Sequence, residues 1–139
     1  MPDLCKKLGI LPGKTVCLIG APPDTAQAIQ ALCSKMVTYL DSLSTQKVDI
    51  LFFWPKDLSG LAERLADLQD QIDPDVAIWV VMPKKKYAGA RGIDFTWEEM
   101  QAAGLSTDLV DNKVASINDV EYGTRFVIRK ERREKYRLA

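Results

Sequence analysis

Short, continuously apolar runs alternate with amphipathic stretches along this chain, and this alternation restricts its fold more than any other feature. The apolar runs lie at 15–19, 37–40, 48–54 and 76–82. Runs this short and this apolar are typical of parallel strands that are covered on both faces. Helical periodicity is clearest in 57–72, where leucines recur on one side. The pattern therefore predicts an α/β fold, a mostly parallel Rossmann-like sheet with helices on both faces.

The last part of the chain predicts two further strands that run in opposite directions. Residues 109–117 contain one strand, 124–130 form the other, and only 118–123 separate them. This connection is too short for a crossover between parallel strands, so we expect an antiparallel C-terminal hairpin. The sheet then has six strands, and residues 1–139 form a single domain.

Two helix starts carry capping signals. Asp24 is placed to cap a helix that reaches about Lys35. Thr96 and Glu99 have the spacing of a capping box, which begins a later helix that ends before Gly104. Asp24 also belongs to the loop that follows the first strand, so it is a candidate ligand-binding residue as well.

Composition excludes several kinds of chemistry. The chain has no histidine, which removes the commonest general base and the commonest metal ligand. Its 19 Lys and Arg residues balance 19 Asp and Glu residues, so no overall charge attracts nucleic acid. We predict no catalytic residues, no metal site and no nucleic-acid partner.

Cysteine usage and hydropathy favour a cytoplasmic protein. The three cysteines, Cys5, Cys17 and Cys33, are odd in number and form no Cys-x-x-Cys motif, so we expect no disulfide. Cys17 and Cys33 fit core positions, and no histidine is present to activate Cys5. The first residues lack the apolar stretch of a signal peptide, and the run 76–82 is too short to span a membrane.

Basic residues gather near the end of the chain. Residues 129–137 carry six basic and two acidic side chains. We interpret 130–139 as a basic C-terminal tail that is solvated, with contact to an acidic partner as the alternative.

The middle strands resemble a known fold. Residues 48–54, the amphipathic helix after them and residues 72–81 resemble the second half of a class I S-adenosylmethionine-dependent methyltransferase. The terminal hairpin resembles the last two strands of such proteins. The resemblance implies that the six strands have the spatial order 2-1-3-4-6-5.

The chain as a whole resembles a family of small, uncharacterised bacterial proteins, a domain of unknown function. The shared features are a Leu-Gly-Ile-x-Pro-Gly-Lys motif near the start, a strand that ends in Gly-Ala-Pro, a strand that ends in Trp-Val-x-x-Pro-Lys-Lys, and a late Gly-Leu-Val-Asp-x-Lys-Val segment. In the last of these, Asp108 replaces the family's Gly. They lie at 8–14, 20–22, 79–85 and 108–114. This resemblance carries no known activity.

The expected topology locates a ligand crevice. Ligands of open α/β sheets bind at the carboxyl ends of strands, where the strand order reverses. That point lies between the strands at 15–19 and 48–54, beside the loops 20–24 and 54–57, with 83–91 nearby. The candidate ligand-binding residues are Gly20, Ala21, Asp24, Asp41, Trp54, Lys56, Lys84, Lys85, Lys86 and Arg91.

Basic and acidic candidates predict different ligands. The three consecutive lysines at 84–86, with Arg91 and Lys56, can attract a phosphate or carboxylate, or they form a solvated basic loop. From its neighbours in the sequence, Asp41 is interpreted as a turn residue. The methyltransferase resemblance gives it another role, in which an acidic side chain at that place binds ribose hydroxyls.

Two motifs depart from the methyltransferase pattern. After Gly20 the chain continues with Pro22-Pro23, which removes two N–H donors and stiffens the turn. Trp54-Pro55 stands where many methyltransferases carry Asn-Pro-Pro or Asp-Pro-Pro. We therefore predict a non-catalytic binding module for a small anionic ligand or a protein partner, with no cofactor. A divergent methyltransferase that uses S-adenosylmethionine is the alternative.

Overall fold

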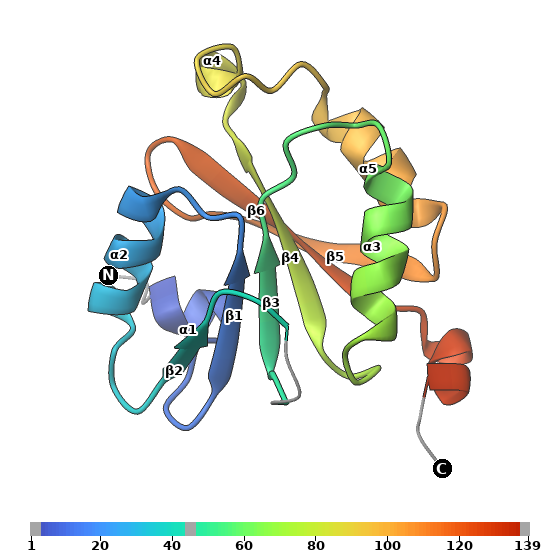
Figure 1. Ribbon diagram of the computed structural model, residues 1–139, viewed down its shortest axis with the longest axis horizontal. Helices are drawn as coiled ribbons and strands as arrows, with labels where there is room; N and C mark the ends of the chain where they lie inside the picture. The colour runs from blue at the N-terminus through green and yellow to red at the C-terminus, as the bar shows by residue number, and fades with distance from the viewer. Residues whose placement is uncertain (1–3, 44–46, 137–139) are drawn as a thin grey trace.

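The computed structural model describes residues 4–43 and 47–136 and has three layers, a six-stranded sheet between two layers of helices (Figure 1). The strand order β2-β1-β3-β4-β6-β5 confirms the order that the methyltransferase resemblance implies. The strands are β1 (Thr15–Ile19), β2 (Thr38–Leu40), β3 (Ile50–Phe53), β4 (Ala77–Pro83), β5 (Leu109–Ser116) and β6 (Glu121–Ile128).

The direction of the strands decides which segments meet at one edge of the sheet. The first four strands pair in parallel, whereas β6 is antiparallel to both β4 and β5. The register pairs Pro83, the last residue of β4, with Glu121, the first residue of β6. The start of the hairpin's second strand therefore lies at the carboxyl edge of the parallel strands.

The outer strand of the hairpin is irregular. The β5–β6 register shifts between Asp111 and Lys113, so Asn112 is an extra residue on the edge strand. Such a bulge bends an edge strand and raises its twist.

Helices cover both faces of the sheet, as the sequence predicts. The side chains of α1 and α2 pack on one face, and those of α3 and α5 pack on the other (Figure 1). No helix within 4–43 and 47–136 combines the length and the apolar character needed to cross a bilayer. The helices are α1 (Leu4–Leu8), α2 (Pro23–Leu32), α3 (Leu61–Asp70), α4 (Lys85–Ala88) and α5 (Trp97–Leu105), followed by the 3₁₀ helix η1 (Lys130–Tyr136).

Alternate residues of β3 divide between the two cores. Leu51 and Phe53 face α3, whereas Ile50 and Phe52 belong to the cluster under α1 and α2. On that second side, Phe52 stacks on Trp79 of β4 with ring centroids 6.0 Å apart. All four β3 residues are buried, which explains why this strand is a continuous apolar run.

The capping box predicted from the sequence is present at the start of α5. Thr96 Oγ1 accepts a hydrogen bond from the Glu99 amide at 3.1 Å, and Glu99 Oε1 accepts one from the Thr96 amide at 2.9 Å. The predicted end of this helix is wrong, because α5 continues through Gly104 to Leu105. A Cβ atom at Gly104 would lie 2.5 Å from the ring of Phe126, so glycine here permits close packing on β6.

Other predicted boundaries also need correction. The residue that precedes the first turn of α2 is Pro22, and Asp24 lies inside that turn without capping it. Pro23 is the first helical residue, and proline suits this position because its φ is already helical. The helix ends at Leu32, short of Lys35. The predicted loop 83–94 contains the short helix α4, and β6 begins three residues earlier than expected, at Glu121.

The basic C-terminal segment is anchored within its described part. Arg132 forms an ion pair with Asp108, and Arg133 Nε donates a hydrogen bond to the Ile128 carbonyl at 2.8 Å. Residues 130–136 therefore form a docked helical turn, and the last part of the predicted tail, 137–139, lies outside the described residues.

The prediction that the chain has no disulfide is wrong. Cys5 of α1 and Cys33, which follows α2, form a disulfide across 28 residues with Cα atoms 5.6 Å apart. The third cysteine, Cys17, is buried and free. Burial, with a smaller contribution from the charge of Asp41, raises the pKa of the Cys17 thiol from 9.0 to about 11. Cysteine usage thus gives no reason for a cytoplasmic location, which stays a prediction.

Reduction of this disulfide is expected to lower the free energy of unfolding by about 3.5 kcal/mol, because the bond closes a loop of 28 residues in the unfolded chain. Urea unfolding with and without dithiothreitol measures the difference. In a Cys5→Ser variant the reductant is expected to have no effect, and an equal response of that variant would contradict the assignment.

Candidate functional site

The loops that follow β1, β3 and β4 meet at the carboxyl edge of the sheet, together with the start of β6 (Figure 1). The strand order reverses between β1 and β3, where the sequence predicts a ligand crevice. The two loops touch each other there. Gly20 has φ +79°, and a Cβ atom on it would lie 3.2 Å from the Trp54 carbonyl oxygen. Only glycine fits this position without strain.

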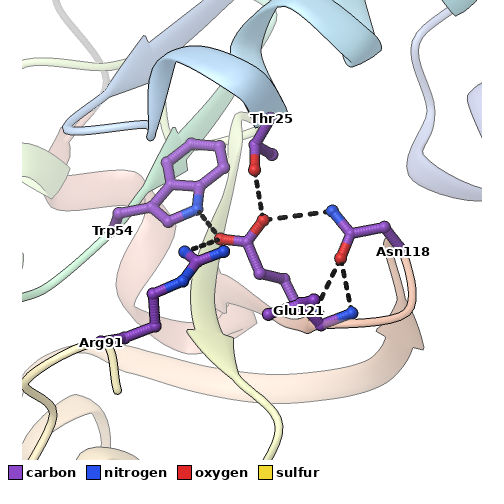
Figure 2. A network of polar contacts seen from close by, with 6 residues as sticks. Thr25, Trp54, Arg91, Asn118 and Glu121 are labelled. Atoms are coloured by element: carbon purple, nitrogen blue, oxygen red, sulfur yellow. Dashed lines mark hydrogen bonds and ion pairs between the residues drawn. The ribbon is translucent and has the colours of Figure 1, made fainter. Parts of the chain in front are cut away.

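A buried carboxylate lies at this edge of the sheet, next to Trp54. Glu121 is 1% exposed, and side chains from several segments surround it (Figure 2). Its Oε1 atom accepts hydrogen bonds from Thr25 Oγ1 and, at 3.1 Å, from Asn118 Nδ2. Its Oε2 atom accepts a 2.8 Å hydrogen bond from Trp54 Nε1 and lies 3.6 Å from Arg91 Nη1.

These contacts satisfy a buried charge that would otherwise be costly. They also connect the first turn of α2, the residue after β3, the loop after α4 and the β5–β6 turn. Asn118 adds a turn motif, because its side-chain oxygen accepts hydrogen bonds from the Val120 and Glu121 amides. Side chains of the protein itself therefore fill the part of the edge between Trp54 and the start of β6, whereas a hollow of about 300 Å³ stays open beside Gly20 and Trp54.

Sequence reasoning missed Glu121. It assigned this residue to the connection before the last strand, and no motif distinguishes a buried glutamate from an exposed one. The sequence contained one weak signal, because the Asn118-Asp119-Val120-Glu121 segment is typical of a tight turn that sets the start of a strand.

The structure brings two of the predicted ligand-binding residues together on Glu121. Trp54 is buried and donates to it, and Arg91 is its charged partner. Arg91 is therefore already paired with a carboxylate. Asp24 lies next to Thr25 in the first turn of α2 and is exposed.

The predicted lysines do not line one common cavity. The Lys84 amide donates to the Val120 carbonyl at 2.6 Å, and Lys85 and Lys86 are exposed on α4. Lys86 Nζ lies over the ring of Tyr87, 5.6 Å from its centroid. Lys56 lines a hollow beside Trp54 with Gly60 and Arg64, whereas Lys85 lines a different cavity near β6. Binding of an anion by these residues stays a prediction.

Three other predicted residues share an open groove between the carboxyl ends of β1 and β2. This β1–β2 groove has a volume of about 440 Å³ and is lined by Gly20, Ala21, Asp41, Leu18, Ala26, Gln30, Tyr39 and Leu40. Asp41 follows β2 directly and is exposed. Tyr39 donates a 2.6 Å hydrogen bond to the Cys33 carbonyl, and burial raises its pKa, so its hydroxyl stays protonated at neutral pH.

The groove combines apolar walls with a carboxylate at one end. Leu18, Leu40 and Ala26 offer surfaces on which a flat ring can pack, and the Asp41 carboxylate accepts hydrogen bonds from hydroxyl groups. Among the described residues, no group of three or more acidic or cysteine side chains is placed to hold a metal ion.

Comparison with known families decides the assignment. The model of a family described as "Protein of unknown function (DUF3052)" matches residues 5–130. The chain belongs to this family. Membership confirms the predicted resemblance to a domain of unknown function. None of the curated proteins compared with the chain matches it.

Solved structures that resemble this member of the DUF3052 family are methyltransferases. A SAM-dependent methyltransferase from Aquifex aeolicus has a TM-score of 0.63 at 11% identity, with 90% of this chain and 87% of that one covered. The N-methyltransferase NodS from Bradyrhizobium japonicum has a TM-score of 0.55 at 9% identity, with 90% and 92% covered. LepI in complex with SAM has a TM-score of 0.55 at 14% identity, with 91% and 39% covered. These similarities confirm the methyltransferase-like fold.

Removal of the buried carboxylate is expected to destabilise the protein strongly. Glu121→Ala leaves Thr25, Trp54 and Asn118 without their acceptor, so we expect the free energy of unfolding to fall by about 3 kcal/mol or more. Arg91→Ala removes a partly exposed partner and should cost about 1 kcal/mol or less. Chemical denaturation measures both.

An exposed glutamate provides the control. Glu63→Ala on α3 is expected to change stability by less than about 0.5 kcal/mol. If Glu121→Ala lies in that range, the hydrogen bonds to Glu121 do not hold the carboxyl edge together.

Proposed function

We propose that the protein is a non-catalytic binding module whose ligand is a nucleoside-class molecule held in the β1–β2 groove. The observation that carries this proposal is the convergence of Gly20, Ala21 and Asp41 around one open groove. The sequence also predicts a binding module, but with an anionic ligand near the basic loop 84–86. Here we propose a different ligand, at the end of β2.

The shape and chemistry of the groove support a nucleoside. Its volume, about 440 Å³, lies in the range of small-molecule sites. A base can pack against Leu18 and Leu40, and the two ribose hydroxyls can donate to Asp41, as an acidic residue after a strand does in dinucleotide-binding folds. The negative charge of Asp41 disfavours an anionic group beside it.

The packed side chains beside the groove support a binding role without catalysis. Trp54 is buried and donates to Glu121, and the loops after β1 and β3 touch at Gly20, which lines the groove. A ligand in the groove is then adjacent to a packed, hydrogen-bonded wall.

A divergent SAM-dependent methyltransferase is the second candidate. It is favoured by the fold, because a neighbour of known structure was solved in complex with SAM. On this alternative, the adenosine part of SAM lies in the same groove. Against this alternative, Pro22-Pro23 and Trp54-Pro55 depart from the methyltransferase pattern.

Calorimetric titration tests both candidates. We expect adenosine to bind, SAM to bind no more tightly than adenosine, and Asp41→Asn to weaken adenosine binding about tenfold, because a charged acceptor is lost. The control is Asp24→Asn, which removes an exposed carboxylate outside the groove and should leave binding unchanged.

Three results would contradict the proposal. Equal adenosine affinity of Asp41→Asn and the unchanged chain would exclude the groove. SAM affinity at least tenfold above that of adenosine, with transfer of its methyl group to any acceptor, would favour the methyltransferase. Stabilisation by inorganic phosphate that a Lys84→Ala/Lys85→Ala variant loses would restore the basic loop as the site.

A further inference from the structure

A second cavity lies on the other side of the Glu121 network, between α4, the start of α5 and the first residues of β6. It has a volume of about 450 Å³ and is distinct from the β1–β2 groove. Its apolar wall consists of Met82, Ile93, Phe95, Trp97 and Tyr122. We call it the α4–α5 cavity.

The aromatic wall of this cavity is held in a defined position. Phe95 is buried and packs in the core with Met82. Trp97 Nε1 donates a 2.8 Å hydrogen bond to Thr124 Oγ1, which fixes the orientation of the indole ring. Trp97 and Tyr122 are half-buried, so both rings keep surface that a ligand can contact.

The charged residues that line the cavity are mostly acidic. Asp94 and Glu98 line it and are exposed, whereas Lys85 is the one cation in its lining. Burial, with a smaller contribution from the charge of Glu98, raises the pKa of Tyr122 above its ordinary value of 10.0. The phenol is therefore neutral at physiological pH. Its hydroxyl has no hydrogen-bond partner among the described residues, and it remains available as a donor or acceptor.

We propose that the α4–α5 cavity binds an organic cation, an ammonium group that carries an apolar or aromatic substituent. The substituent packs on Met82 and Phe95, and the cation lies against the faces of Trp97 and Tyr122 within reach of the carboxylates. Aromatic faces attract cations through their quadrupole, and nearby carboxylates add to this attraction. This site is independent of the nucleoside proposal.

The competing ligand classes fit the cavity less well. A carboxylate or phosphate would lie near both Asp94 and Glu98, with only the exposed Lys85 to balance them. A neutral apolar molecule would gain the same packing but nothing from the charges at the mouth. Removal of a carboxylate should therefore weaken the binding of a cation, strengthen the binding of an anion and leave the binding of a neutral molecule unchanged.

The test is a titration of the full chain with phenyltrimethylammonium, followed by calorimetry and by the NMR signal of the Trp97 indole N–H. We expect saturable binding that shifts this signal. Glu98→Gln and Asp94→Asn are each expected to weaken binding about threefold to tenfold, and Lys85→Ala to tighten it about twofold. Glu63→Gln, an exposed change on α3, is the matched control and should leave the affinity unchanged.

Several results would overturn the proposal. One is binding of benzoate or benzyl alcohol as tightly as the ammonium compound. Another is unchanged affinity in both carboxylate variants, or a shift of the Trp54 indole signal in place of that of Trp97. Asp41→Asn is expected to bind phenyltrimethylammonium normally, so failure of this proposal and failure of the nucleoside proposal are distinguishable.

Discussion

The hydrogen bonds to the Glu121 carboxylate join most of the segments that meet at the carboxyl edge of the sheet. A buried charge requires partners, and here they come from α2, the end of β3, the loop after α4 and the β5–β6 turn. This network occupies the edge between Trp54 and the start of β6. The β1–β2 groove lies on one side of it, the α4–α5 cavity lies on the other, and a smaller hollow of about 300 Å³ lies beside Trp54. The two candidate ligand sites are therefore separate, with Trp54 and Glu121 between them.

Local patterns predicted most of the fold. Continuous apolar runs identified the buried strands, and the Thr96–Glu99 spacing identified the start of α5, because both signals depend on neighbouring residues. Pairings between distant residues were not predictable in this way. Thr25 and Glu121 are 96 residues apart, and the Cys5–Cys33 bond spans 28. Tertiary packing is likewise absent from local patterns, as at Gly104, where α5 continues past its expected end and packs closely on Phe126.

The candidate site was predictable where it depends on topology. Gly20, Ala21 and Asp41 follow neighbouring parallel strands, so they had to meet at one edge. The placement of the lysines at 84–86 was harder to predict, because it depends on a short helix in a segment that the sequence predicts to be a loop. Lys84 precedes α4 in extended conformation, and successive helical residues point about 100° apart, so Lys85 and Lys86 face different directions.

The bulge at Asn112 has a consequence for association between copies of the chain. An exposed sheet edge offers unpaired amides and carbonyls on which another molecule can add a strand, and this is the start of many fibrils. Here β5 is kinked next to Lys113, and the opposite edge, β2, is only three residues long. Both borders of the sheet are thus poor templates for aggregation, although the strands between them are among the most apolar segments of the sequence.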